Sequence, residues 1–225
     1  VYNIETKTTH EITDGMADAI SPVWDADGKY IYFLASTDYG LNSGWLDMSS
    51  YDRPVTRALY SVALSKSTPS QALPKTDEEK AEAKKDSVST ANAKNGENKD
   101  KKSNISEVKI DFEGIQNRIV ALTDAEKDYA DLYEAPEGTV FIETSSGRQK
   151  TILRYTVKDG KKETHVSNIT YFAVSQDKKS TLYGSSSGWG ILKSSDSNKK
   201  AGDDKLDNAS DIKISIYQSI ISRPK

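Results

Sequence analysis

Residues 21–33, SPVWDADGKYIYF, place an aromatic strand, an acidic turn with glycine and a second apolar strand in direct succession. Asp and Gly are common in hairpin turns, and Gly28 can adopt the positive φ that such a turn requires. Tyr30–Leu34 is a continuous apolar run, which is typical of a strand covered on both faces. The segment therefore predicts a β-hairpin whose second strand is buried.

The same plan recurs twice further along the chain. Residues 132–142, LYEAPEGTVFI, and residues 171–183, YFAVSQDKKSTLY, each contain two strand-like segments around a polar turn. Gly138 and Lys178, within these turns, are 40 residues apart, a spacing found in four-stranded propeller blades. Three copies predict about three to four blades, too few to close a typical ring. The chain is therefore expected to be part of a longer protein.

Short strands and turns also dominate elsewhere, with almost no amphipathic helix. The expected strands are Tyr30–Leu34, Arg57–Leu64, Ser106–Phe112, Asn117–Leu122, Thr139–Glu143, Thr151–Val157, Glu163–Ser167, Ile169–Val174 and Thr181–Tyr183. The expected fold class is all-β, a β-propeller fragment of about three to four four-stranded blades.

A charged insertion interrupts this pattern. Residues 65–104 contain 9 Lys, 7 Asp or Glu and no aromatic side chain. Such a segment cannot bury enough apolar surface to offset its ordering entropy, so we expect a disordered insertion. The predicted organisation is propeller blades over 1–64, the insertion over 65–104, and further blades over 105–225. The last blades are expected to lead into a region beyond this sequence.

Composition excludes several kinds of partner and chemistry. With 31 basic and 34 acidic residues the formal net charge is -3, so no nucleic-acid partner is expected. The absence of Cys excludes disulfides, thiol nucleophiles and cysteine-ligated zinc. No stretch approaches the roughly 18 consecutive apolar residues of a membrane-spanning helix. The compartment stays open between cytoplasm and periplasm, because the start at Val1 has no signal segment and is expected to be internal.

Several motifs resemble a known family. Residues 21–33 resemble the SPxWSPDGKxIxF blade motif of the tricorn and TolB-like propellers. Residues 45–54 (WLDMSSYDRP), 57–60 (RALY) and 108–122 (VKIDFEGIQNRIVAL), with Phe172-Ala173-Val174-Ser175, are more specific. Together they resemble the second propeller of bacterial tricorn-like serine peptidases, tricorn protease homologues in the carboxyl-terminal-processing peptidase superfamily. The resemblance covers most of the chain outside residues 65–104.

This resemblance implies a non-catalytic segment of a proteolytic enzyme. In the family, a helical section, a PDZ domain and the serine peptidase domain follow the propeller, so the catalytic residues are expected beyond Lys225. The propeller would gate or channel peptides and unfolded polypeptides, and its other partners would be the remaining domains of the same chain. The family's archetype forms homo-oligomers, and no cofactor is implied. The alternative is a free-standing TolB-like propeller that acts as a protein-binding module.

No catalytic residue or metal site is expected within the chain itself. Residues 184–188, GSSSG, fit the nucleophile-elbow pattern but precede a strand-like segment, which favours a hairpin turn. A catalytic triad would need His10 or His165, and both are interpreted as surface or blade-edge histidines. Residues 25–28, DADG, begin like a calcium loop, but Ser36 stands where the closing Glu is needed, so a turn is favoured.

Three residues are candidates for substrate binding: Trp45, Arg53 and Arg57. Trp45 lies in a polar loop and is the most plausible exposed aromatic contact, whereas Trp24 is expected in the blade core. Arg53 and Arg57 could hold a peptide carboxylate, or they could pair with Asp47 and Asp52, the interpretation favoured here.

Overall fold

The computed structural model describes residues 1–15, 18–36, 55–71, 108–123 and 127–202, apart from the side chain of Ser146. The chain divides into two compact units, Val1–Lys127 and Asp128–Lys225. Within the described residues there is no α-helix, and accordingly none that is long and apolar enough to span a bilayer.

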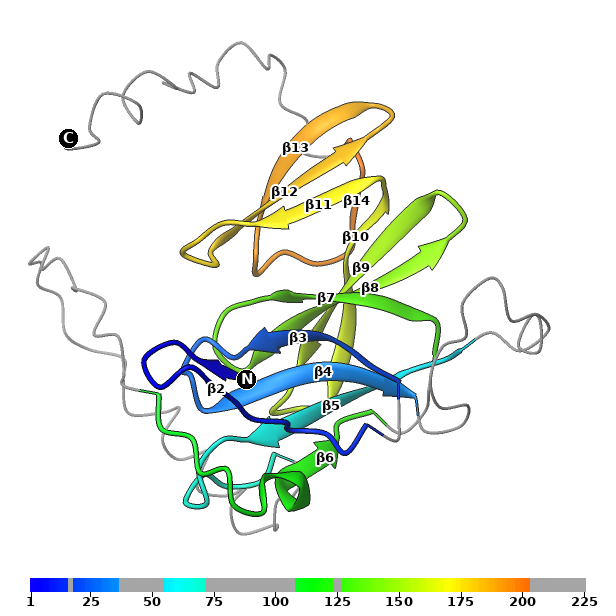
Figure 1. Ribbon diagram of the computed structural model, residues 1–225. Coiled ribbons are helices and arrows are strands. Elements are labelled where there is room, and N and C mark those ends of the chain that lie inside the picture. Colours follow the sequence, from blue (N-terminus) through cyan, green and yellow to red (C-terminus); the bar gives the residue numbers. More distant parts are fainter. Residues whose placement is uncertain (16–17, 37–54, 72–107, 124–126, 203–225) are drawn as a thin grey trace, which may run out of the picture. The chain divides into compact units, whose positions relative to one another are not determined.

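The first unit contains a four-stranded antiparallel sheet (Figure 1). Its strands follow one another in chain order: β3 (Asp18–Trp24), β4 (Tyr30–Ser36), β5 (Ala58–Ala63) and β6 (Ile119–Ala121). A separate hairpin pairs β1 (Tyr2–Asn3) with β2 (Thr8–Thr9), and a short 3-10 helix, η2 (Ile115–Arg118), precedes β6. Every residue of β4 is buried, which confirms the prediction that this apolar run is an inner strand.

The second unit contains two further sheets, which are antiparallel apart from one two-residue strand. The first has the neighbour order β7 (Tyr129–Glu134), β8 (Thr139–Ser146), β9 (Gln149–Thr156) and β10 (Lys161–Ile169). A two-residue strand, β14 (Lys199–Lys200), extends it by pairing parallel to β10. The other sheet consists of β11 (Tyr171–Val174), β12 (Ser180–Ser185) and β13 (Gly188–Lys193).

The three predicted repeats form the first hairpins of these three sheets. The turns that join β3 to β4, β7 to β8 and β11 to β12 contain Gly28, Gly138 and Lys178, with φ values of 71°, 71° and 59°. In two of them an aspartate bonds the backbone two residues on: Asp27 Oδ1 accepts from Lys29 N at 2.8 Å, and Asp177 Oδ1 from Lys179 N at 3.1 Å. This side-chain bond stabilises the turn locally. The hairpin prediction of the sequence repeat is therefore confirmed at all three places.

The described residues thus form an all-β, propeller-like fragment, as the sequence predicts. The three sheets have four, five and three strands, and among the described strands no sheet closes on itself. The predicted strand Ser106–Phe112 is wrong over residues 108–112, which are irregular, and the one predicted at Asn117–Leu122 begins instead with η2.

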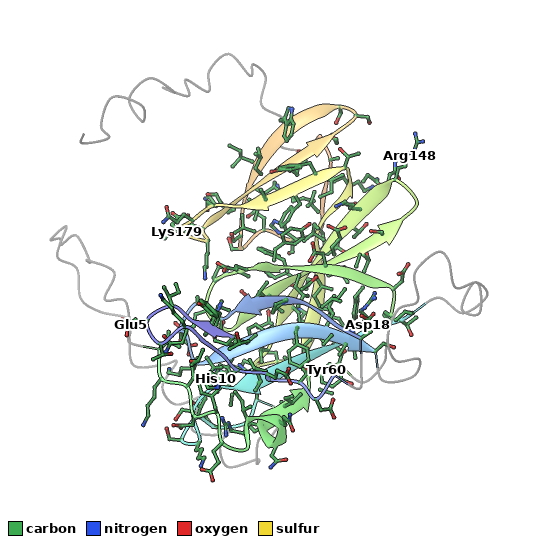
Figure 2. The ribbon with its side chains drawn as sticks, in the orientation of Figure 1. Glu5, His10, Asp18, Tyr60, Arg148 and Lys179 are labelled. Atoms are coloured by element: carbon green, nitrogen blue, oxygen red, sulfur yellow. The ribbon has the colours of Figure 1, made fainter. Side chains whose placement is uncertain are left out.

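Each unit has its own apolar core. In the first unit, one face of β4 and β5 packs with η2, and we name this cluster the first core: Ile31, Phe33, Ala35, Val62, Leu64 and Ile115. In the second unit, side chains from both sheets pack together (Figure 2). This second core consists of Ala135, Phe141, Ile152, Val166, Ile169, Phe172, Tyr183 and Leu192. Burial of these side chains is the main favourable contribution to folding.

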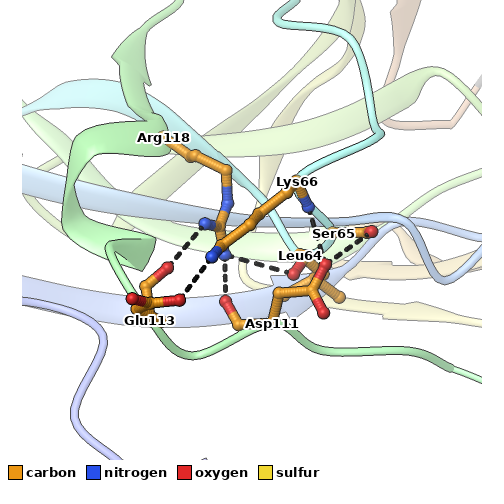
Figure 3. A network of polar contacts seen from close by, with 6 residues as sticks. All are labelled: Leu64, Ser65, Lys66, Asp111, Glu113 and Arg118. Carbon is orange, nitrogen blue, oxygen red and sulfur yellow. Dashed lines mark hydrogen bonds and ion pairs between the residues drawn. The ribbon is translucent and has the colours of Figure 1, made fainter.

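Polar contacts join the chain on the two sides of the predicted insertion (Figure 3). The Arg118 guanidinium donates to the carbonyl oxygens of Ala63 (2.8 Å), Leu64 (3.3 Å), Glu113 (3.2 Å) and Asp111. The Asp111 carboxylate in turn accepts from the backbone N–H of Lys66 at 2.8 Å. These bonds satisfy the polar groups of Asp111 outside a strand ladder.

The first residues of the predicted insertion are bonded to the sheet. Tyr30 Oη donates to the Pro69 carbonyl oxygen at 2.8 Å, and Gln71 Nε2 donates to Tyr32 Oη at 3.0 Å. The rest of the predicted insertion, residues 72–104, lies outside the described residues.

Candidate binding groove

A groove runs along the edge of the first unit's sheet. It has two adjoining parts of about 830 Å³ and 890 Å³, and both are lined by Val1, Tyr2 and Trp24. The first part is also lined by the apolar side chains of Ile12, Ile20, Pro22, Ile31 and Phe33. The second part is lined by Val108, Ile110 and Phe112. We name the two parts together the Trp24 groove. Volumes of this size are in the range of small-molecule sites.

The position of Trp24 follows from the register of β3. Trp24 is paired with Ile31 across the strands, and directly paired residues in an antiparallel sheet project to the same face. Trp24 therefore lies on the face of the first core, but β3 is an edge strand and Trp24 remains 37% exposed. The expectation that Trp24 is core is wrong for this reason.

A bulge shapes β3 beside the groove. The register shifts between Ile20, paired with Leu34, and Val23, paired with Tyr32, so three steps on β3 match two on β4. Ser21 has a φ of 52° at this place, and Pro22 has no N–H to donate. A bulge with proline blunts the hydrogen-bonding edge of a strand. The groove therefore offers side chains rather than a regular backbone ladder.

The opposite wall comes from distant parts of the sequence. The His10 ring, just after the β1–β2 hairpin, stacks on Phe112 with 3.8 Å between ring centroids and an interplanar angle of 14°. The backbone N–H of His10 donates to the Val1 carbonyl oxygen at 2.8 Å. Ile12, Ile110 and Phe112 pack against the first core. The groove is thus built on core packing and not on one loop.

The groove has charges of opposite sign in its two parts. Glu11 and Asp14 line the first part, and Lys109 lines the second. Within the described residues, no group of three or more His, Asp or Glu is placed to hold a metal ion.

The predicted substrate-binding residues are not part of this groove where the structure describes them. Trp45 and Arg53 lie outside the described residues, as do Asp47 and Asp52. Arg57 Nε donates to Asp18 Oδ2 at 3.1 Å, and its Nη2 contacts the same oxygen. The side chains are only 12% and 11% exposed, and Figure 2 labels Asp18 at the start of β3. The Arg57 guanidinium thus has an internal partner, Asp18, that is more distant in the sequence than Asp47 and Asp52.

The surroundings of His165 differ from those of a catalytic residue. His165, expected at the surface or a blade edge, is fully buried, so that interpretation is wrong. Its Nε2 lies 2.9 Å from Thr181 Oγ1 and its Nδ1 lies 2.7 Å from the Asp196 carbonyl oxygen. Burial lowers the pKa of His165, which favours the neutral ring. A buried Thr–His pair cannot meet a substrate.

The serine motif is a turn. Ser185 pairs with Gly188 across β12 and β13, and the two residues between them form the hairpin turn. This confirms the hairpin interpretation of residues 184–188. Ser185 Oγ accepts from or donates to Ser187 Oγ at 2.8 Å, so its bonding is local, as in an ordinary polar turn.

Sequence reasoning missed the residues that make the groove. An available signal was Trp24 itself, because it ends the first strand of its sheet, directly before the hairpin turn. The His10 and Phe112 stack could not be found, because 102 positions separate these residues and no local pattern links them.

The fold is that of a propeller segment. No protein-family model matches the chain, and no curated protein matches it. Among solved structures, the chain is similar to the crystal structure of the tricorn protease, with a TM-score of 0.53 and 17% sequence identity. The similarity covers 85% of this chain and only 18% of the tricorn protease chain. At this identity the likeness supports a loosely tricorn-like fold and does not extend to activity.

Proposed function

We propose that this chain is a non-catalytic propeller segment of a tricorn-like serine peptidase and that it binds unfolded polypeptide for a peptidase domain elsewhere in the same protein. The observation that carries the proposal is the structural likeness to the tricorn protease over 85% of the chain. The Trp24 groove supports it, because an exposed tryptophan above an apolar floor is a common peptide contact.

The absence of hydrolysis by this segment is part of the proposal. Among the described residues, the hydroxyl partners of the histidine rings are Thr8, at 3.4 Å from His10 Nε2, and the buried Thr181. A peptidase nucleophile needs an accessible hydroxyl and an oriented base within hydrogen-bond reach. Neither pair meets both conditions.

The experiment is a binding and turnover assay on the 225-residue chain. A reduced, alkylated polypeptide with a fluorescent label should bind saturably, and the same polypeptide should stay intact on prolonged incubation. Absence of binding would contradict the proposal, and so would cleavage that disappears in Ser186→Ala.

The second candidate function is a free-standing TolB-like module that binds a folded protein. The blade motif in residues 21–33 favours this function as much as the first, because tricorn and TolB-like propellers share that motif. The two functions differ in their ligand. For the peptidase segment, an unlabelled unfolded polypeptide should compete with the labelled polypeptide for binding, and folded proteins of similar charge should not.

A further inference from the structure

We propose that the Trp24 groove binds an extended peptide with three separate contacts. An apolar side chain packs on Trp24, a basic side chain lies beside Glu11 and Asp14, and an acidic side chain lies beside Lys109. This inference rests on the proposed function, namely that the segment binds polypeptide, and it names the site and the class of peptide.

Trp24 is the central contact because it lines both parts of the groove. It is 37% exposed although its paired neighbour Ile31 is 4% exposed and belongs to the first core. Large aromatic side chains that stand over a packed apolar floor contribute most to peptide affinity. An apolar side chain of the ligand would remove the remaining Trp24 surface from water.

The bulge of β3 determines how the peptide is held. Ser21 and Pro22 interrupt the edge of β3, and Pro22 itself lines the groove. A peptide added as a further strand would need consecutive N–H and C=O groups along that edge. The groove therefore recognises side chains, and the peptide direction is set by charge and not by backbone pairing.

The charges give the groove a polarity. Glu11 and Asp14 line only the first part, and Lys109 lines only the second part, with Trp24 shared between them. A ligand group of charge opposite to that part of the groove would be attracted there, and a group of the same charge would be repelled. A peptide with one basic and one acidic end around an apolar residue is complementary to this arrangement.

The test uses three seven-residue peptides with blocked termini, a central leucine and a neutral fluorophore. Their end residues are Lys and Glu, Lys and Lys, or Glu and Glu. Fluorescence anisotropy with the full 225-residue chain should show about three-fold tighter binding of the mixed peptide than of either like-charged peptide, as expected for exposed charge pairs.

Two variants assign the contacts. Trp24→Ala should weaken the mixed peptide at least about ten-fold, while Trp189→Ala, at an exposed tryptophan of the second unit, should leave its affinity unchanged. Lys109→Glu, on an exposed residue, should reverse the order so that the Lys and Lys peptide binds best. This variant keeps the inference testable if Trp24→Ala does not fold.

The outcomes separate the inference from the proposed function. Binding that is unaffected by both Trp24→Ala and Lys109→Glu would overturn this inference and leave the proposed function standing, because polypeptide would then bind elsewhere on the segment. Failure of the three peptides and of the long unfolded polypeptide to bind would overturn both.

Discussion

His165 and Thr181 connect two sheets of the second unit through one hydrogen bond, with 2.9 Å between Nε2 and Oγ1. His165 belongs to β10 and Thr181 to β12. The other ring nitrogen, Nδ1, lies 2.7 Å from the Asp196 carbonyl oxygen. Because a carbonyl oxygen can only accept, Nδ1 carries the proton of the neutral ring and Nε2 accepts from the Thr181 hydroxyl. Phe141 and Phe172 lie around the ring, with centroid distances of 4.8 Å and 6.0 Å.

This arrangement predicts that the second unit loses stability in mild acid. Burial lowers the pKa of His165, and the charge of Arg154 acts in the same direction, while the Asp196 carbonyl and carboxylate oppose it. As the pH falls, His165 takes up a proton near pH 6.5 in the unfolded chain and only at lower pH in the folded chain. The contribution is therefore fully present above that pH, and the free energy of unfolding falls as pH decreases below it towards the lowered pKa.

The measurement is urea unfolding at a series of pH values from 7.5 to 5.0. His165→Gln should reduce the free energy of unfolding by about 1–3 kcal/mol at pH 7.5 and should flatten its dependence on pH. His10→Gln, which removes the other histidine of the chain, is the comparison variant. An identical slope in the parent and in His165→Gln would contradict the prediction.

Local sequence patterns predicted the hairpins because the determinants are local. Gly28, Gly138 and Lys178 all have positive φ in turns that join two strands, and glycine or a short polar turn between apolar runs is sufficient to indicate this. The fold class follows from such repeats. The prediction of a strand over residues 108–112 was wrong, because the strand-like alternation competes there with the side-chain hydrogen bonds of Asp111.

The candidate site was much less predictable, because its determinants are long-range. Trp24 is exposed since β3 is an edge strand, a property of sheet order that an apolar pattern does not contain. His165 is buried since a second sheet covers it. Arg57 pairs with Asp18, 39 positions away, while the sequence suggested nearer aspartates.

Gly190 is a steric requirement of β13. A Cβ atom there would lie 2.3 Å from Cζ of Tyr183, and this ring is 1% exposed and belongs to the second core. Gly190→Ala should therefore lower the free energy of unfolding by about 3 kcal/mol, as expected for overpacking of a tightly filled site. Urea unfolding monitored by circular dichroism measures the change.

Gly184→Ala is the matched control for Gly190→Ala. Its Cβ would lie 3.0 Å from the Trp189 ring, but that side chain is 47% exposed and can move. The loss should be below about 1.5 kcal/mol. Equal losses in the two variants would show that the buried Tyr183 ring does not determine the cost.

Substitutions of Gly138 and Lys178, at related turns, are expected to change the free energy of unfolding in opposite directions. Gly138 has a φ of 71° and a Cβ there would meet no atom within 4 Å, so Gly138→Ala should cost only backbone strain, about 1 kcal/mol. Lys178, with a φ of 59°, already bears this strain. Lys178→Gly should raise the free energy of unfolding by about 0.5 kcal/mol, after the greater entropy of unfolded glycine is subtracted.

The Lys178 variant also removes an ion pair with Glu134, in which Nζ and Oε2 are 3.0 Å apart. Glu134→Gln removes the same pair without changing the turn and should change stability little, because partly exposed pairs contribute little. Thermal unfolding of the three variants measures the signs. A loss of stability in Lys178→Gly beyond that of Glu134→Gln would contradict the strain argument.

Arg118 is predicted to be the main polar contact that fixes the two segments next to the predicted insertion. Its guanidinium donates to four backbone carbonyl oxygens, two of them at Ala63 and Leu64, which are buried. Arg118→Ala leaves these acceptors without the donor, and buried acceptors that lose a charged donor cost about 2–3 kcal/mol in total. Urea unfolding should show this loss.

The neighbouring ion pair between Lys66 and Glu113 provides the control. Lys66 is positively charged, as Arg118 is, but its side chain bonds no buried acceptor. Lys66 Nζ lies 2.5 Å from Glu113 Oε2, and both side chains are more than half exposed. Lys66→Ala should therefore leave the free energy of unfolding unchanged within error, since solvent screens such pairs. Limited proteolysis should also distinguish the variants: Arg118→Ala should speed cleavage on both sides of residues 72–107, because the bonds to Leu64 and Asp111 that hold the adjoining chain are lost. If Lys66→Ala were as harmful as Arg118→Ala, the stability would come from the surface charges and not from the satisfied carbonyl groups.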